Sequence, residues 1–398
     1  MEMEKNSGEI EKTPYHSYKL KTLPRGCKYC VKGQKLVLFI TGICNRKCFY
    51  CPISDEKKGK DVIYANEWNT EHAGGDITDK ELDIIVQEAK LCNAKGAGIT
   101  GGDPLLVNSR TVAAINRLKS VYGRKFHIHL YTSLENVTEQ RLQDLYNAGL
   151  DEIRFHPDLE DDSVWDRIKL AKLFRWDIGV EIPAIPKYEE KTKKLIDYFA
   201  DKINFLNLNE LELSDSSGNT LEAHGYSAKD EESYAVSGSE ETGLALMRYC
   251  EEKGYRFKIH FCTVKLKDAV QIAERIKKRS KNAASPLDLV TDEGLLIRGV
   301  IYLKETAPSF SYRKMLKELD PAKRKELTEK LNALQADLAK KHSLKKDAIA
   351  VDYDKLRLLM SYKKVKKLAE RLKTAGLVPA IVEEYPTKDA LEVDIDFL

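Results

Sequence analysis

Short apolar runs alternate with amphipathic, helix-like stretches through the first two thirds of this 398-residue chain. The runs are five to eight residues long and are bounded by turn-forming or polar residues, as expected for buried strands. They predict strands over residues 36–43, 96–100, 126–132, 152–156, 178–182, 203–208 and 255–261.

The stretches between these runs carry helix start and stop signals. Thr78 and Glu81 have the spacing of a capping box and predict a helix that continues to about Lys95. Further helices are predicted over residues 110–122, 139–148, 163–175, 189–201 and 240–253. Strands that alternate with helices favour a parallel sheet with right-handed crossovers. Because there are six or seven such units, we expect an α/β fold of the full or partial (β/α) barrel type, with the strand ends facing one mouth.

Two segments interrupt the alternation. Residues 214–239 are rich in Ser, Gly, Asp and Glu and predict a mobile loop, either a lid at the mouth or an exposed insertion. Residues 282–286 mark a boundary, after which 287–302 alternate like a hairpin, 314–374 are helical and charged, and 391–397 are strand-like. We therefore expect an N-terminal extension (1–34), a barrel domain (35–282) and a smaller α+β C-terminal domain (287–398).

Composition narrows the class of protein. A hydrophobic share of 42% is typical of a soluble globular chain, and a net charge of +3 indicates no partner by itself. No apolar stretch approaches the length of a membrane span, and residues 1–12 lack the apolar core of a secretory signal. Eight cysteines are too sparse for a disulfide scaffold, so we expect no membrane association and a cytoplasmic location.

The charge is distributed unevenly. Residues 301–375 contain 20 Lys and Arg against 10 Asp and Glu, whereas residues 376–398 contain one Lys against six acids. A basic block suits a polyanion such as RNA, although solvated helix faces account for it equally well.

Three cysteines, Cys44, Cys48 and Cys51, follow directly on the first apolar run. Thiolates placed so close together on one loop converge on a common metal centre. Three cannot pair among themselves, and a zinc site would need a further ligand pair that the neighbouring sequence lacks. On a cubane iron–sulfur cluster, three cysteine ligands leave one iron open for another molecule.

The Cys-x3-Cys-x2-Cys spacing, with Tyr50 before the last cysteine, resembles the motif of the radical S-adenosylmethionine (SAM) superfamily. The resemblance covers roughly residues 35–213 and is greatest to archaeal relatives of pyruvate formate-lyase activating enzyme. It implies a partial (β/α)6-type barrel, a [4Fe-4S] cluster on Cys44, Cys48 and Cys51, bound SAM, a one-electron reductant and a 5'-deoxyadenosyl radical.

The same resemblance implies where SAM is bound. Gly101, Gly102 and Asp103 follow the second strand where the superfamily usually has Gly-Gly-Glu; two glycines allow close approach and leave peptide groups free for a ligand. Four polar residues near the ends of the next strands are implied cofactor contacts, and any of them could instead be a satisfied polar group inside a barrel. They are Thr132, Ser133, Arg154 and Glu181.

A second metal site is indicated by Cys27 and Cys30, a knuckle-like pair just ahead of the first strand. Cys262 is the most plausible third ligand, and His260 lies two residues before it on the same strand face. This set could bind zinc or an auxiliary iron–sulfur cluster. The alternative is an unmetallated pair with Cys262 as a buried small hydrophobe.

We therefore predict a radical SAM enzyme. The basic residues between 265 and 279, together with the basic C-terminal block, favour tRNA or another RNA as substrate; a protein or a small metabolite is the alternative. A different class of function, a non-catalytic zinc-binding or RNA-binding protein, predicts tetrahedral zinc and no SAM turnover. The sequence leaves the oligomeric state open.

Overall fold

The computed structural model describes residues 9–398, which divide into two compact units. The first unit ends at Arg275 and the second runs from Ile276 to Leu398. The division falls inside helix α9 (Ala273–Ala283), slightly before the boundary expected at residues 282–286.

The first unit is built on a sheet whose centre, within the described residues, is seven parallel strands. All seven strands predicted from the apolar runs are confirmed. In sheet order they are β13 (Lys258–Cys262), β10 (Phe205–Glu210), β9 (Asp177–Ala184), β8 (Glu152–Phe155), β7 (His127–Thr132), β6 (Gly96–Thr100) and β3 (Lys35–Phe39).

Antiparallel strands extend both edges of this sheet. β4 (Tyr64–Ala65) and β5 (Trp68–Asn69) follow β3, while β2 (Tyr18–Leu20) and β1 (Ile10–Lys12) follow β13. No strand pairing among residues 9–398 joins β3 to β13, so the barrel is partial, as expected.

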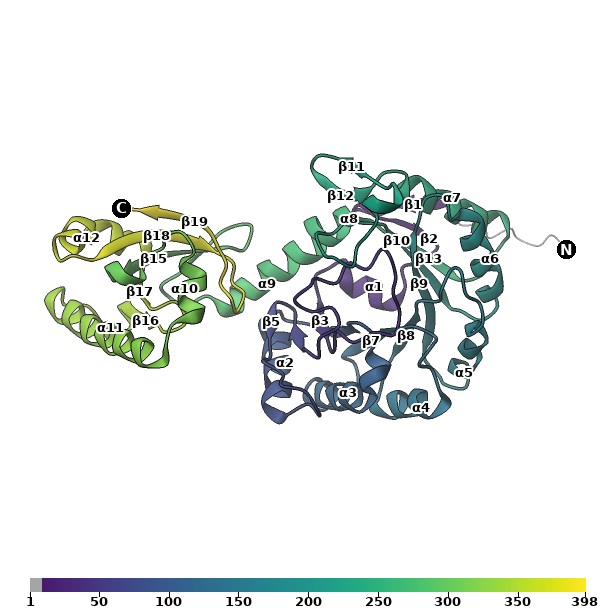
Figure 1. The fold of residues 1–398 in the computed structure, drawn as a ribbon, viewed down its shortest axis with the longest axis horizontal. Coiled ribbons are helices and arrows are strands. Elements are labelled where there is room, and N and C mark those ends of the chain that lie inside the picture. The colour runs from purple at the N-terminus through teal and green to yellow at the C-terminus, as the bar shows by residue number, and fades with distance from the viewer. Residues whose placement is uncertain (1–8) are drawn as a thin grey trace. The chain divides into compact units, whose positions relative to one another are not determined.

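Helices cover the outer side of the curved sheet (Figure 1). The capping box predicted at Thr78 and Glu81 is present at the start of α2, and Thr138 caps α4, which ends at the left-handed Gly149. The covering helices are α2 (Asp79–Leu91), α3 (Asn108–Tyr122), α4 (Glu139–Ala148), α5 (Ile168–Ala171), α6 (Glu189–Phe199) and α7 (Ser239–Glu252).

Helix α1 (Arg25–Cys30) lies inside the ring of strands rather than outside it (Figure 1). A Cβ atom on Gly26 would stand 2.4 Å from Arg154 Nη2 and 2.7 Å from Glu152 Oε1, so only glycine permits this approach. The Gly26 N–H donates to Glu152 Oε2 at 2.8 Å. The residues before the first parallel strand therefore fill part of the barrel interior.

Two predicted elements of this unit differ in the structure. The helix expected over 163–175 is reduced to a 3-10 turn (Trp165–Arg167) and the single turn α5. The irregular segment 214–239 contains a hairpin of β11 (Ala228–Asp230) and β12 (Ser233–Val236). The sequence did not indicate this hairpin, because only Ala235 and Val236 of these strands are buried and the remaining residues are largely polar.

After β13 the chain continues through α8 (Val264–Leu266) and a π-helical turn (Lys267–Ile272) into α9. The second unit has sheet order β16-β17-β15-β18-β19, and β14 pairs with β15. Its strands are β14 (Leu289–Val290), β15 (Leu296–Tyr302), β16 (Ile349–Asp352), β17 (Arg357–Met360), β18 (Val378–Glu384) and β19 (Glu392–Phe397); its helices are α10 (Tyr312–Glu318), α11 (Pro321–Lys341) and α12 (Tyr362–Thr374).

The hairpin expected within 287–302 and the strand-like C-terminus are confirmed. The predominantly helical stretch expected over 314–374 is interrupted by β16 and β17, which the sequence did not indicate. Their charged positions are used inside the unit: Arg357 is fully buried and its guanidinium pairs with Glu384 at 2.7 Å and Asp352 at 2.9 Å.

Candidate functional site

A cavity of about 780 Å³ occupies the interior of the first unit. Its wall brings together all but one of the site residues predicted from the sequence, although they come from positions 27 to 262 of the chain. The predicted residues in the wall are Cys27, Cys30, Cys44, Cys48, Tyr50, Cys51, Gly101, Gly102, Thr132, Ser133, Arg154, Glu181, His260 and Cys262.

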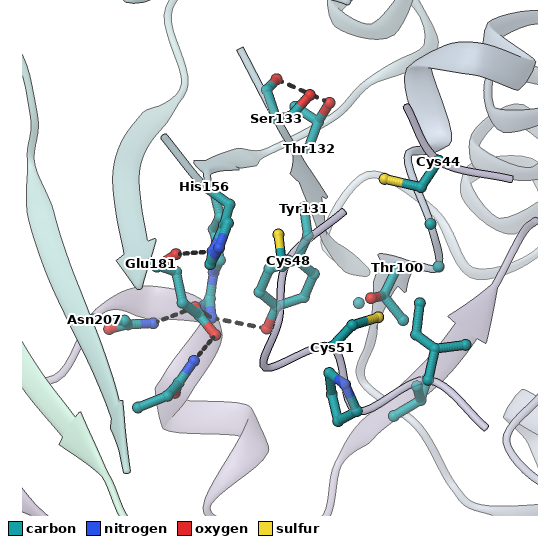
Figure 2. A pocket seen from close by; sticks show the side chains of 18 of the residues that line it. Cys44, Cys48, Cys51, Thr100, Tyr131, Thr132, Ser133, His156, Glu181 and Asn207 are labelled. Atoms are coloured by element: carbon teal, nitrogen blue, oxygen red, sulfur yellow. Dashed lines mark hydrogen bonds and ion pairs between the residues drawn. The ribbon is translucent and has the colours of Figure 1, made fainter. Parts of the chain in front are cut away.

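The loop that carries Cys44, Cys48 and Cys51 follows the C-terminal end of β3. Figure 2 shows the three side chains around one region of the cavity. Cys44 is exposed, and Cys48 and Cys51 are half-buried. Burial raises the pKa of Cys44 and of Cys48, and the nearby Arg46 guanidinium opposes the rise for Cys48.

The Gly101-Gly102 pair packs directly against the start of the cysteine loop. A Cβ atom on Gly101 would stand 2.2 Å from the Thr41 carbonyl oxygen, and one on Gly102 would stand 2.2 Å from that of Ile43. The Gly102 and Asp103 N–H groups donate to these same two carbonyls at 2.8 and 2.9 Å. The N–H groups of Gly102 and Asp103 are therefore not free for a ligand, because they hold the cysteine loop in place.

Asp103 is the predicted residue that does not line the cavity. Its side chain is buried and accepts hydrogen bonds from Thr132 Oγ1 (2.6 Å), Ser133 Oγ (2.6 Å) and Asn136 Nδ2 (2.8 Å). The carboxylate thus stands behind the wall and fixes the side chains of Thr132 and Ser133, two residues that line the cavity.

Arg154 and Glu181 form a buried ion pair at 2.8 Å in the cavity wall. Glu181 also accepts from Asn207 Nδ2 at 2.8 Å and Asn209 Nδ2 at 3.0 Å, as the dashed lines in Figure 2 show for Asn207. Burial alone would raise the pKa of Glu181, but Arg154 and the two amides hold it below its ordinary value. Asn207 and Asn209 therefore mark the inward side of β10.

Several wall residues were not predicted as site residues. His156 Nε2 lies 3.0 Å from Tyr50 Oη, its Nδ1 lies 2.8 Å from the Glu181 carbonyl oxygen, and burial lowers its pKa to about 4. No spacing motif marks such residues; the signal that could have found them is their inward register on the predicted strands. Other polar wall residues of this kind include Lys35, His129, Tyr131, Asn207, Asn209, Glu212, Lys267 and Gln271.

The segment 214–239, expected to be a mobile loop, contacts the cysteine loop directly. Ser216 Oγ donates to the Cys51 carbonyl at 3.2 Å, and the Thr220 N–H donates to the Phe49 carbonyl at 2.7 Å. The segment therefore covers the outer side of the loop that carries the three cysteines.

Within residues 9–398, no three His, Cys, Asp or Glu side chains already stand around one point in an arrangement that could hold a metal ion. This applies equally to Cys44, Cys48 and Cys51 and to the set of Cys27, Cys30, Cys262 and His260. In both sets the side chains share a cavity wall, and metal binding would require their rotation toward each other.

Comparison with known proteins decides the family. The sequence profile of the Radical SAM superfamily matches residues 38–176. A protein of Methanocaldococcus jannaschii, provisionally named a glycyl-radical enzyme activating enzyme, is 40% identical over 98% of this chain and 96% of its own length. The chain belongs to the radical SAM superfamily.

Solved structures of radical SAM proteins were also found. The radical SAM methyltransferase TsrM from Kitasatospora setae is 14% identical, with a TM-score of 0.35, over 50% of this chain and 41% of its own. Methylornithine synthase (PylB) is 15% identical, with a TM-score of 0.36, over 55% and 65%. Among the described residues, no helix is both long and apolar enough to cross a membrane.

The radical SAM family implies a [4Fe-4S] cluster and SAM, and the donor set fits both. Three thiols occupy one region of the wall, which suits a cluster with one iron left open. Thr132, Ser133, Arg154 and Glu181 line the same cavity, whose volume suits a ligand of this size.

Proposed function

We propose that this radical SAM enzyme removes a hydrogen atom from a glycine residue of a protein partner and thereby activates a glycyl-radical enzyme. The observation that carries the proposal is the 40% identity, over nearly the whole length of both chains, to a relative named for that activity. The tRNA substrate expected from the basic segments has no support in the comparisons.

The cavity also suits a peptide. Its volume of about 780 Å³ is in the upper part of the usual range for ligand pockets. Glycine lacks a side chain, which allows a peptide to bring its Cα atom close to a bound cofactor.

The roles of the residues follow from their positions. Cys44, Cys48 and Cys51 would hold the cluster, and Thr132 and Ser133, oriented by Asp103, would contact SAM. When bound, cluster and SAM supply reductive cleavage of the sulfonium to a 5'-deoxyadenosyl radical, with the electron from an external one-electron reductant. The residues of this cavity would hold the glycine Cα of the partner beside bound SAM, so that its hydrogen atom would be transferred and 5'-deoxyadenosine and a glycyl radical on the partner would result.

The first experiment tests the chemistry. Enzyme reconstituted anaerobically with iron and sulfide, then reduced with dithionite in the presence of SAM, should release 5'-deoxyadenosine. Cys48→Ala should abolish this release. Cys250→Ala, in a buried core cysteine that does not line the cavity, should leave it intact. Release of the same amount from Cys48→Ala would refute the proposal.

The second experiment tests the substrate class. A synthetic peptide with a central glycine deuterated at Cα should transfer deuterium into 5'-deoxyadenosine, whereas the same peptide with deuterated alanine at that position should transfer less. Transfer from deuterated tRNA but not from the glycine peptide would replace the protein substrate with RNA.

A further inference from the structure

Three thiols in the cavity wall have no part in the proposed reaction. Cys27 and Cys30 lie three residues apart on α1, so they share one helix face, and Cys262 ends β13. All three line the cavity that also holds the Cys44, Cys48 and Cys51 loop.

These thiols come from a helix and a strand that are distant in the chain. Helix α1 lies inside the barrel, where the Gly26 N–H donates to Glu152 on β8 and Cys27 Sγ lies 3.3 Å from Asn207 Nδ2 on β10. Cys262 ends β13, whose neighbours in the sheet are β10 and β2. A ligand shared by α1 and β13 would therefore fasten the helix to the barrel wall.

His260 supplies a nitrogen in the same wall. In the parallel register His260 is opposite Asn207 and Cys262 is opposite Asn209, so both side chains face inward. His260 Nε2 lies 3.1 Å from Ser17 Oγ, while Nδ1 is buried and has no hydrogen-bond partner among residues 9–398. A polar contact at one ring nitrogen that leaves the other free is the arrangement found for metal-binding histidines.

The thiols of this set lie among polar groups of the cavity wall. Cys27 Sγ lies 3.3 Å from Asn207 Nδ2, 3.6 Å from Asn207 Oδ1 and 3.6 Å from Arg154 Nη2, and Cys262 Sγ lies 3.9 Å from Gln271 Nε2. A bound metal would displace the thiol protons.

Cys92 and Cys250 do not line the cavity. Cys92 Sγ lies 3.0 Å from Glu88 Oε1 and 3.3 Å from Asn66 Nδ2, and Cys250 belongs to the main hydrophobic core. These two cysteines therefore serve as controls that lie outside the cavity shared by the other thiols.

We propose that Cys27, Cys30, Cys262 and His260 bind one zinc ion in a tetrahedral site that joins helix α1 to strand β13. Three thiolates and one imidazole are a common structural zinc ligand set. The site fills all four positions with protein ligands, so its role is structural: it holds α1 inside the barrel by joining it to β13. This inference does not depend on the proposed substrate.

The test is metal analysis of the full-length protein. Purified wild type should contain one zinc per chain, in addition to the iron bound after reconstitution. Cys30→Ser and Cys262→Ser should lose the zinc yet keep the iron, while Cys250→Ser should keep both. Wild type without zinc, or zinc unchanged in both Cys30→Ser and Cys262→Ser, would overturn the proposal.

The ligand set is tested with cobalt. Co²⁺ introduced in place of zinc should give the visible absorption of a tetrahedral thiolate site. His260→Ala should weaken Zn²⁺ binding by at least about tenfold in competition with a chelator. His260→Cys should restore it as a four-thiolate site, which a histidine with a packing role alone would not do. Extra iron and sulfide, in place of zinc, lost from Cys30→Ser would overturn the assignment in favour of an auxiliary cluster.

Discussion

At the scale of single residues, Asp103 occupies the motif position where the superfamily usually has Glu. Its carboxylate stands behind the cavity wall and accepts hydrogen bonds from Thr132, Ser133, Asn136 and the Leu105 N–H. An acid with four donors around it orients its neighbours, and Thr132 and Ser133 line the cavity.

We expect Asp103→Asn to raise the Kd for SAM about tenfold, because the amide can no longer accept from both hydroxyl groups. Isothermal titration of the reconstituted protein, well below its melting temperature, measures this. Asp337→Asn, an exposed acid on α11, is the control. If Asp103 acts by positioning Ser133, the double variant Asp103→Asn/Ser133→Ala should have the same Kd for SAM as Asp103→Asn alone. A Kd in which the effects of the two substitutions add would contradict this positioning role.

Lys35 is a second informative residue. It is buried in the cavity wall, with its ammonium group 2.8 Å from His127 Nδ1 and 3.0 Å from the Ala97 carbonyl oxygen. Burial lowers its pKa to about 7. Because the folded pKa is below the unfolded value of about 10.4, the unfolded chain binds more protons between these pH values, and this residue's contribution to stability rises with pH from 7 to about 10.

We expect the free energy of unfolding of wild type, relative to Lys35→Met, to increase by up to about 4 kcal/mol between pH 7 and pH 10. Urea unfolding of both metal-free proteins at several pH values measures this difference in the free energy of unfolding. Titrating groups that the two proteins share contribute equally to both and cancel. For Lys28→Met, an exposed lysine on α1, the difference should not vary with pH. A flat difference for Lys35→Met would show that the ammonium is not desolvated.

At the scale of elements, the parallel strands were predictable because each contains a short group of apolar residues between turn signals. Most of their apolar side chains belong to the main hydrophobic core, whereas polar residues such as Arg154 and Asn207 line the cavity. The helices were predictable where a cap fixed their start, as Thr78 and Thr138 did.

The elements that the sequence missed depend on contacts distant in the chain. The β11–β12 hairpin consists largely of exposed residues and lies in a segment that packs on the cysteine loop. β16 and β17 carry Asp352 and Arg357, and charged residues usually indicate an exposed surface. Here Arg357 pairs with Asp352 and with Glu384 on β18, a contact that the sequence does not indicate. For the site, the spacing of the cysteines predicted their role. No spacing motif indicates His156 or Asn209, which could have been found only from their positions on the inward face of the predicted strands.

The segment 214–239 should protect the cluster, because it covers the backbone of the cysteine loop. We expect Thr220→Pro, which removes both the N–H and the hydroxyl donor to Phe49, to speed the loss of the cluster's visible absorption in air several-fold. Glu231→Ala, between β11 and β12, should leave the rate unchanged. Equal rates in all three proteins would show that these contacts do not shield the loop.

At the scale of the whole molecule, the site and the second unit are separable. Every residue that lines the cavity lies between Cys27 and Gln271, within the first unit. The second unit has its own hydrophobic clusters and its own buried charge pairs, so it meets the usual criteria of an independent domain.

A chain that ends after Ala284 should therefore bind the cluster and SAM and release 5'-deoxyadenosine without substrate at a rate within about twofold of the full chain. Far-UV circular dichroism of the shortened chain checks that it is folded. The second unit carries the basic block, and we expect its surface to contact a protein partner. Deuterium transfer from a full-length protein partner should then fall more than transfer from the short glycine peptide. Loss of iron from a folded shortened chain would instead show that the second unit helps to build the metal site.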